Sequence, residues 1–268
     1  MLAAKAVSEF KKSGYFVIPG VIDAVLNRRL GAFVAGIASG AGSRRLLDEA
    51  WCAHLAGALR GDARIRSLLP RNAVAVQCTL FDKSPTKNWL VSLHQDLSIP
   101  VKERVESPEC SGWSEKEGRL YVQPPVSVLE RLVAVRVHID DCLAESGALR
   151  VVAHSHMEGR VDPSRAEALR QQHGETVIPV ARGGALVMRP LILHASSKAT
   201  SLVPRRVLHF VFGPPALPLG LEWRWAVWSR RSNALTTSSL AITLMPGCRA
   251  QRHAAVTRRT ESDRASSQ

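Results

Sequence analysis

A change of pattern at Ala73 constrains the fold of this chain more than any other feature. From there on, the chain consists of short runs in which apolar, often β-branched, residues alternate with others, and Gly, Pro, Asp and Ser separate the runs. Such runs predict short β-strands joined by turns, as in a β-sandwich or barrel. They span residues 74–80, 132–139, 148–152, 176–180, 184–188 and 206–212.

The first 70 residues have a different, mostly helical pattern. Leucines and Trp51 recur at helical spacing between residues 46 and 59, and Asp23 stands where a helix can be capped. A short β-like run at residues 14–20 interrupts the helices. We therefore predict an α+β domain in which N-terminal helices pack on one face of a double-sheet β core.

Two segments stand apart from this core. Residues 97–128 form a long polar connection that contains Trp113 and Tyr121, and a loop of that length is usually a lid or a binding loop. Residues 228–268 are rich in Ser, Thr and Arg without apolar periodicity, which predicts a disordered tail. We expect one domain over residues 1–227 and a basic tail over residues 228–268.

The chain is strongly basic, with 36 Lys and Arg against 23 Asp and Glu. Residues 228–268 hold seven arginines and two acids, so this tail carries +5 of the net +13. No run of basic residues with interleaved aromatics occurs, and the predicted lid has four basic and five acidic residues. We interpret the charge as solvated surface and expect no specific nucleic-acid partner.

We also expect no membrane partner and a cytoplasmic location. The longest charge-free runs, residues 30–43 and 232–248, are shorter than the roughly 20 apolar residues that span a bilayer. The first dozen residues lack the apolar core of a secretory signal. Five widely spaced cysteines without a C-x-x-C pair favour a reducing compartment over a disulfide framework. The oligomeric state is left open.

The motif that carries chemistry is His94-Gln95-Asp96. Side chains two apart on a strand share a face, so His94 and Asp96 present an imidazole and a carboxylate together. A second histidine, His194, follows an apolar run. Two histidines and one carboxylate on one face of a metal suit a non-haem Fe(II) oxygenase. Arg205, eleven residues after His194, can bind a carboxylate through two parallel hydrogen bonds.

Taken together, the motifs between residues 81 and 212 resemble the phytanoyl-CoA dioxygenase family of Fe(II)/2-oxoglutarate oxygenases. The matching stretches are Phe81-Asp82-Lys83, Asn88-Trp89, His94-Gln95-Asp96, Gly147–Val152 with Ser155-His156, Arg182–Leu186, and His194 with Arg205. They cover about half of the chain in the family's order. Residues 153–156 read Ala-His-Ser-His, where the family usually has a Pro-Gly-Ser-His turn. The resemblance implies a double-stranded β-helix, a cupin-like jelly roll with helices in front.

The resemblance also implies roles for single residues. The iron ligands would be His94, Asp96 and His194. Arg205 would bind the distal carboxylate of 2-oxoglutarate and Ser196 would hydrogen-bond it. Gln77 stands where related hydroxylases place a polar group that faces the pocket.

The chemistry implied by the family is hydroxylation of an unactivated C–H bond in a small molecule, with release of succinate and CO2 and with ascorbate as a stimulant. Related halogenases lack the carboxylate ligand, so the presence of Asp96 predicts hydroxylation or desaturation and argues against halogenation.

A second H-x-D motif, His138-Ile139-Asp140, competes with the first. Asp140 lies 54 residues before His194 and Asp96 lies 98 residues before it, and many iron oxygenases show the shorter separation. Spacing alone therefore favours His138, whereas the flanking Asn88-Trp89 favours His94. We predict that His138 is a core histidine and that Asp140 belongs to a turn at a strand end.

Other polar residues of the β region have open interpretations. His209 shares the strand parity of Arg205, so it either faces the pocket or packs as a buried histidine, whereas Arg206 should point outward into solvent. His154 and His156 indicate a turn rather than a metal pair.

Two other classes of protein remain as alternatives. A catalytically inactive cupin-like binding module would keep the fold without turnover, but the set of His94, Asp96, His194 and Arg205 is complete. A nucleic-acid-associated protein rests on net charge alone. The sequence indicates a small-molecule substrate by resemblance and does not identify it.

Overall fold

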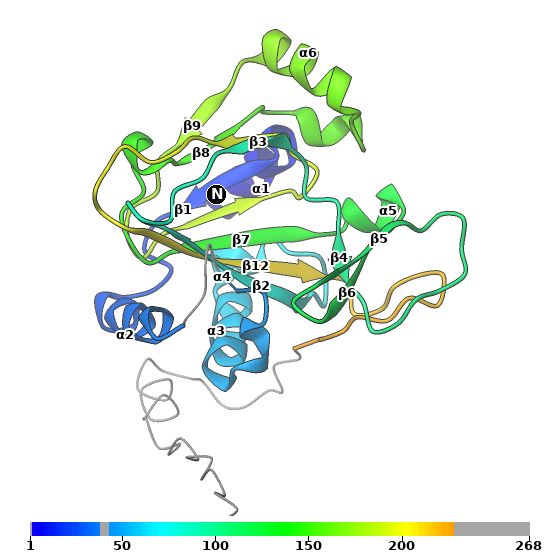
Figure 1. Cartoon of the computed structure of the whole chain (residues 1–268), viewed down its shortest axis with the longest axis horizontal. Helices are drawn as coiled ribbons and strands as arrows, with labels where there is room; N and C mark the ends of the chain where they lie inside the picture. Colours follow the sequence, from blue (N-terminus) through cyan, green and yellow to red (C-terminus); the bar gives the residue numbers. More distant parts are fainter. Residues whose placement is uncertain (1, 38–42, 228–268) are drawn as a thin grey trace, which may run out of the picture.

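The fold was obtained as a computed structural model that describes residues 2–37 and 43–227 of the chain (Figure 1). The predicted tail, residues 228–268, lies outside the described residues. No helix in the described part of the chain is long and apolar enough to cross a membrane.

Two antiparallel sheets face each other and form the β core (Figure 1). The larger sheet has the strand order β1-β10-β7-β12-β2, with β1 at Tyr15–Ile18, β10 at Ala185–Met188, β7 at Val133–His138, β12 at Arg205–Gly213 and β2 at Val74–Lys83. The smaller sheet has the order β3-β11-β8-β9, with β3 at Val91–His94, β11 at His194–Ser196, β8 at Leu149–Val151 and β9 at Thr176–Ile178. This is the predicted double-stranded β-helix.

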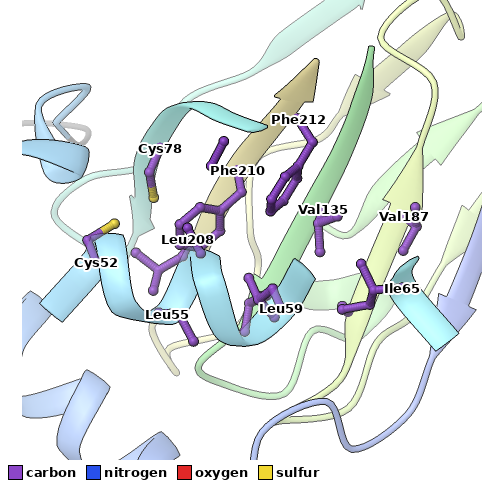
Figure 2. Close-up of a cluster of buried hydrophobic side chains, with 14 of the residues drawn as sticks. Cys52, Leu55, Leu59, Ile65, Cys78, Val135, Val187, Leu208, Phe210 and Phe212 are labelled. Atoms are coloured by element: carbon purple, nitrogen blue, oxygen red, sulfur yellow. The ribbon is translucent and has the colours of Figure 1, made fainter. Parts of the chain in front are cut away.

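Helices cover the outer face of the larger sheet, as the N-terminal pattern predicted (Figure 1). They are α2 (Ala24–Ala35), α3 (Ala50–Gly61) and α4 (Ala63–Arg66), whereas α1 (Leu2–Ser13) packs beside the edge strand β1. Figure 2 shows Leu55, Leu59 and Ile65 of these helices packed against Phe210 and Phe212 of β12. These five side chains are almost fully buried, so helices and sheet share one core.

Strand alternation sends every second side chain of the larger sheet into the space between the two sheets. On β7, Val133, Val135 and Val137 belong to the core under the helices, so Arg136 and His138 face inward. On β12, Leu208, Phe210 and Phe212 pack under the helices, so Arg205 and His209 face inward. The interior between the sheets therefore holds several polar side chains.

Residues 97–128 are more structured than the predicted polar connection. A third sheet of order β4-β6-β5 comprises Ile99–Pro100, Arg119–Gln123 and Ser111–Lys116, and a short helix, α5, follows at Val126–Leu129. Glu117 forms an ion pair with Arg44, and Arg119 forms an ion pair with Asp48. These contacts fix the β5–β6 hairpin to the helical front of the molecule.

Arg206 does not point into solvent, which corrects the expectation from strand parity. It lies on the helix-covered face, where Nε and Nη2 each donate to a different oxygen of Asp140 at 2.8 Å. Its Nη1 also donates to Gly31 O at the helical layer. The bidentate pair explains why a charged residue is tolerated between sheet and helices.

A helix that the sequence pattern did not indicate lies over the smaller sheet (Figure 1). This helix, α6, spans Pro163–His173, with Asp162 preceding it and Gly174 ending it. Proline at the first helical turn and glycine after the last are typical boundary signals. They were present in the sequence, but the apolar periodicity of the segment is too weak to single it out.

Candidate metal centre

Three side chains converge at one edge of the smaller sheet. His94 ends β3, His194 begins β11, and the two residues are paired partners across the strands. Asp96 lies two residues beyond β3, and its carboxylate oxygens are 3.8 Å from Nε2 of each histidine. One nitrogen or oxygen from each of the three side chains lies within 4.8 Å of the others. The sequence-predicted set is thus brought together and could hold one metal ion.

Both histidines are oriented in the same way by the backbone. Nδ1 of His94 lies 2.8 Å from Ser92 O, and Nδ1 of His194 lies 2.9 Å from Ile192 O. A carbonyl oxygen only accepts, so Nδ1 carries the proton in each ring and Nε2 keeps its lone pair. Both lone pairs face Asp96, which is the arrangement that a metal ligand needs.

Gln95 anchors the segment between the two ligands of the H-x-D motif. Its Nε2 donates to Gly159 O at 2.7 Å and to Leu191 O at 2.6 Å, and its Oε1 accepts from Val161 N at 2.9 Å. The backbone N–H of Asp96 donates to Pro190 O at 2.9 Å, which ties this segment to the chain that leads into β11. The middle residue of the motif therefore helps to hold both ligands in place.

The electrostatics of His194 and Asp96 fit a metal site. Burial lowers the pKa of His194 to about 4, so its imidazole is neutral at neutral pH. Burial acts to raise the pKa of Asp96, but the nearby His194, His209, His94 and Arg136 outweigh it, and the net shift is downward. A neutral imidazole and an ionised carboxylate are the forms that bind a divalent cation. His194 is closed off, with a side chain only 4% exposed, whereas His94 and Asp96 are open at 40% and 37%.

A second polar cluster lies at the start of β12. Arg205 is 3% exposed and Lys83, its partner in the β2–β12 register, is fully buried. Lys83 Nζ donates to Ser196 Oγ at 2.7 Å and to Ser197 O at 2.6 Å, and Arg205 Nε has no hydrogen-bond partner among the described residues. The cluster holds two buried cations and no carboxylate ion-paired to them in the described part of the chain, as expected of a site for an anion.

Two of the stretches that carry the family resemblance shape this cationic cluster. Gly147 has φ +71°, and a Cβ there would lie 2.7 Å from Ser197 O and 3.2 Å from Lys83 Nζ. Only glycine allows this close approach. Trp89 places its ring 5.3 Å from Lys83 Nζ, and the preceding Asn88 exchanges two hydrogen bonds with Ala199.

The competing H-x-D motif is not assembled. His138 is buried between the sheets, and neither of its ring nitrogens has a hydrogen-bond partner among the described residues. The strand ends at His138, and Asp140 turns to the other face, where Arg206 binds both of its oxygens. Because the chain bends between them, His138 and Asp140 do not share a face as the pattern allowed.

Gln77 lies on β2, half-buried, and donates from Nε2 to Thr79 Oγ1 at 3.0 Å. In the β2–β12 register it pairs with Val211, beyond His209 and away from Arg205. Its described side-chain contact does not join it to the three candidate ligands, so its predicted place at the pocket stays a prediction.

Arg136, like Lys83, is a polar residue of the site that the sequence interpretation missed. It lies 5% exposed on β7, directly opposite His209 of β12, and its Nη1 is 2.9 Å from His209 Nδ1. Burial, followed by the neighbouring Arg205, lowers the pKa of Arg136 to about 10. The run Val-Ala-Val-Arg-Val-His carried a signal, because an arginine that alternates with buried valines must face the opposite, inner side.

The fold and the site define a class: a cupin-like β-helix with a His-Asp-His group at one edge of its smaller sheet. The sequence profile of the phytanoyl-CoA dioxygenase family matches residues 10–207. The chain therefore belongs to the phytanoyl-CoA dioxygenase family, and it is an Fe(II)/2-oxoglutarate-dependent dioxygenase. No curated protein sequence matches the chain.

Solved structures of low sequence identity share the fold. The non-haem α-ketoglutarate-dependent epimerase SnoN from nogalamycin biosynthesis is 14% identical, with a TM-score of 0.60 over 88% of this chain and 91% of that chain. EctD from S. alaskensis is 18% identical, with a TM-score of 0.60 over 87% and 85%. HygX from Streptomyces hygroscopicus, solved with nickel and 2-oxoglutarate, is 19% identical, with a TM-score of 0.56 over 78% and 86%.

Proposed function

We propose that this dioxygenase hydroxylates an unactivated C–H bond of a small molecule, with His94, Asp96 and His194 as the ligands of Fe(II). The observation that carries the proposal is the convergence of two imidazole lone pairs and one carboxylate within 4.8 Å. When bound, Fe(II) and 2-oxoglutarate would activate O2, so that one oxygen atom enters the substrate and the other enters succinate, which forms from 2-oxoglutarate with release of CO2. The protein's residues hold both and leave one side of the site open to the substrate.

The cationic cluster supports a place for 2-oxoglutarate. Arg205 would bind the distal carboxylate through its guanidinium, whose Nε is unpartnered among the described residues. Ser196 would add a hydroxyl contact, and Lys83, which already donates to the Ser196 hydroxyl, would add a second positive charge. A dicarboxylate between this cluster and the metal would neutralise two buried cations that otherwise cost free energy.

The type of product is the part of the chemistry that a test must decide. Among the structural neighbours, one is named an epimerase and another, SnoK, a carbocyclase. The carboxylate of Asp96 supports hydroxylation over halogenation, since a halide needs the position that Asp96 takes.

The test is incubation of the full chain with Fe(II), ascorbate and 2-oxoglutarate in a metabolite extract, with succinate and small-molecule masses measured together. A mass gain of one oxygen in step with succinate is the expected result. If succinate forms only with substrate but no small molecule gains an oxygen atom, the enzyme catalyses another reaction of this type, such as epimerisation or ring closure. No succinate above a metal-free control in any extract would instead favour the inactive binding module.

Arg205→Ala should weaken 2-oxoglutarate binding by about 2–3 kcal/mol, because a charged hydrogen-bonding partner is removed from a buried anion. The measurement is calorimetric titration of the metal-loaded protein without oxygen. Arg206→Ala is the matched control, since Arg206 faces the helices and pairs with Asp140. An unchanged affinity in Arg205→Ala would move the distal carboxylate site elsewhere.

Lys83 should make 2-oxoglutarate binding depend on pH. Burial, with Arg205 next in effect, lowers its pKa from 10.5 to about 8. The ammonium is charged below this pKa, so the affinity for 2-oxoglutarate should fall as the pH rises above about 8. Lys83→Met should weaken binding at neutral pH and remove this pH step, measured by the same titration across the pH range.

The melting temperature of Lys83→Met tests independently whether the buried charge of Lys83 destabilises the ligand-free fold. The folded pKa lies below the ordinary value, so the unfolded chain binds more protons between about pH 8 and 10.5. The charge of Lys83 therefore destabilises the ligand-free fold below about pH 8, and Lys83→Met should melt higher at neutral pH. A lower melting temperature together with weaker binding would indicate only a structural defect.

The cellular setting is also part of the proposal. The described cysteines, Cys52, Cys78, Cys110 and Cys142, are free and buried. This fits a reducing compartment, and we propose the cytoplasm. The partner is a small-molecule substrate, as for other enzymes of the family.

A further inference from the structure

A third imidazole lies against the carboxylate of Asp96 and has no role in the proposed function. His209 Nε2 is 3.8 Å from Asp96 Oδ2, the same distance that separates Asp96 from His94 and His194. His209 is 4% exposed and reaches the site from β12 in the larger sheet, whereas His94 and His194 come from the smaller sheet. It is not a member of the three-residue group that could share a metal ion.

The partner of His209 differs from the partners of the two candidate ligands. His94 and His194 each direct Nδ1 at a backbone carbonyl, which accepts. His209 directs Nδ1 at Arg136 Nη1, at 2.9 Å. A guanidinium has only donors, so His209 Nδ1 must accept and carries no proton.

It follows that the neutral His209 ring carries its proton on Nε2, the nitrogen that faces Asp96. Around one carboxylate, two imidazoles present lone pairs and the third presents an N–H. The lone pairs suit a metal, and the N–H suits a carboxylate oxygen that the metal does not use. Histidine is thus a candidate metal ligand at two positions and a hydrogen-bond donor at the third. The group that contacts Nδ1, a carbonyl oxygen or a guanidinium, decides which role each ring has.

We propose that Arg136 and His209 form an outer-sphere relay that positions Asp96 as a metal ligand. Arg136 fixes the tautomer of His209, and His209 donates from Nε2 to Oδ2 of Asp96, the oxygen that also faces His194. This leaves Oδ1, which faces His94, for the metal. The 3.8 Å separation between His209 Nε2 and Asp96 Oδ2 has to shorten by about 0.9 Å to reach a hydrogen bond of about 2.9 Å. The inference rests on the proposed function for the identity of the metal site, but the tautomer of His209 does not.

The placement of Arg136 supports the relay. Its guanidinium lies 5.1 Å from the Phe81 ring centroid, and no carboxylate in the described part of the chain is ion-paired to it. Its register partner across β7 and β12 is His209, so the two Cα atoms are held opposite each other by the sheet. The negative charge of Asp96 partly compensates the buried positive charge of Arg136, with the neutral His209 ring between them. Because it contacts both groups, the His209 ring is held in one orientation.

The first experiment determines the tautomer in the metal-free protein. Nitrogen NMR of the imidazole rings should show His209 protonated on Nε2, unlike His94 and His194, which should be protonated on Nδ1. In Arg136→Met, the His209 signal should become a mixture of tautomers. A His209 ring protonated on Nδ1 in the unaltered protein would overturn the relay, whatever the enzyme's activity.

The second experiment measures Co(II) affinity by anaerobic titration of its visible absorption. His209→Leu should bind Co(II) about 10- to 100-fold more weakly, the range for loss of an outer-sphere partner. His209→Gln, whose amide NH2 can replace the Nε2–H donor, should recover most of the affinity. His138→Leu is the matched control, because His138 is equally buried on the neighbouring strand without a hydrogen-bond partner among the described residues.

The outcomes separate the relay from a structural effect and from the proposed function. Equal weakening in His209→Leu, His209→Gln and His138→Leu, or unchanged affinity in His209→Leu, would overturn the relay. Failure of the unaltered protein to bind Co(II) would overturn the metal site itself, and the NMR experiment would still decide the tautomer.

Discussion

Asp96→Ala should abolish both the Fe(II)/2-oxoglutarate complex and turnover. Asp96 supplies the only carboxylate of the three-residue group, and no other described residue completes a comparable group around His94 and His194. Its removal leaves the buried guanidinium of Arg136 without the nearby negative charge of Asp96. We expect metal affinity to fall by more than the roughly 100-fold upper range for an outer-sphere partner, because a ligand itself is lost.

The measurement is an anaerobic titration with Fe(II) in the presence of 2-oxoglutarate, followed through the weak visible charge-transfer band. His94→Ala should abolish the band as well. His138→Ala and Asp140→Asn provide the matched control, because they alter the second H-x-D motif, which the fold does not assemble. Loss of the band in His138→Ala with retention in His94→Ala would show that the ligand assignment is wrong.

Phe210→Ala should reduce the free energy of unfolding by about 3–5 kcal/mol, the usual cost of emptying a large aromatic site in a core. The Phe210 side chain is 0% exposed and lies under helix α3 beside Phe212, with ring centroids 6.4 Å apart (Figure 2). The helical layer and the larger sheet meet at this point, so the cavity cannot close without moving one of them.

Denaturant unfolding measures this loss, with Leu202→Ala as the control. Leu202 is 81% exposed, and its truncation should change the free energy of unfolding by less than about 0.5 kcal/mol. Phe210 faces away from Arg205 and His209 on the same strand, so the folded variant should still bind Co(II) normally. A loss below about 1 kcal/mol in Phe210→Ala would contradict the packing of the helices on the sheet.

Local patterns predicted those parts of the site that depend on neighbours in the chain. The two-residue spacing predicted that His94 and Asp96 lie together, and strand parity predicted that His209 shares a face with Arg205, although it left open whether His209 reaches the pocket. Strand parity wrongly predicted that Arg206 points into solvent. Parity indicates which face of the sheet a side chain is on, but it does not indicate what covers that face. Here the covered face carries Asp140, so the arginine is paired there.

The third sheet escaped prediction for a related reason. Its strands are two to six residues long, and Ser111–Lys116 has no apolar alternation. Hydrogen bonds to partner strands stabilise such segments, and a single-chain pattern carries no record of which partner is present.

The sequence by itself determined the strands of the larger sheet, the helical front and the residue types able to bind iron and a dicarboxylate, because these follow from the chemistry and spacing of near neighbours. Spacing left two H-x-D motifs in competition, and only the tertiary structure decided between their geometries. It paired His94 with His194 across β3 and β11, and it turned Asp140 away to Arg206. It also placed Arg136 opposite His209, because β7 and β12, which are far apart in the chain, pair in that register. Such register is a property of the assembled sheet, since each contact forms only when both strands are already in place.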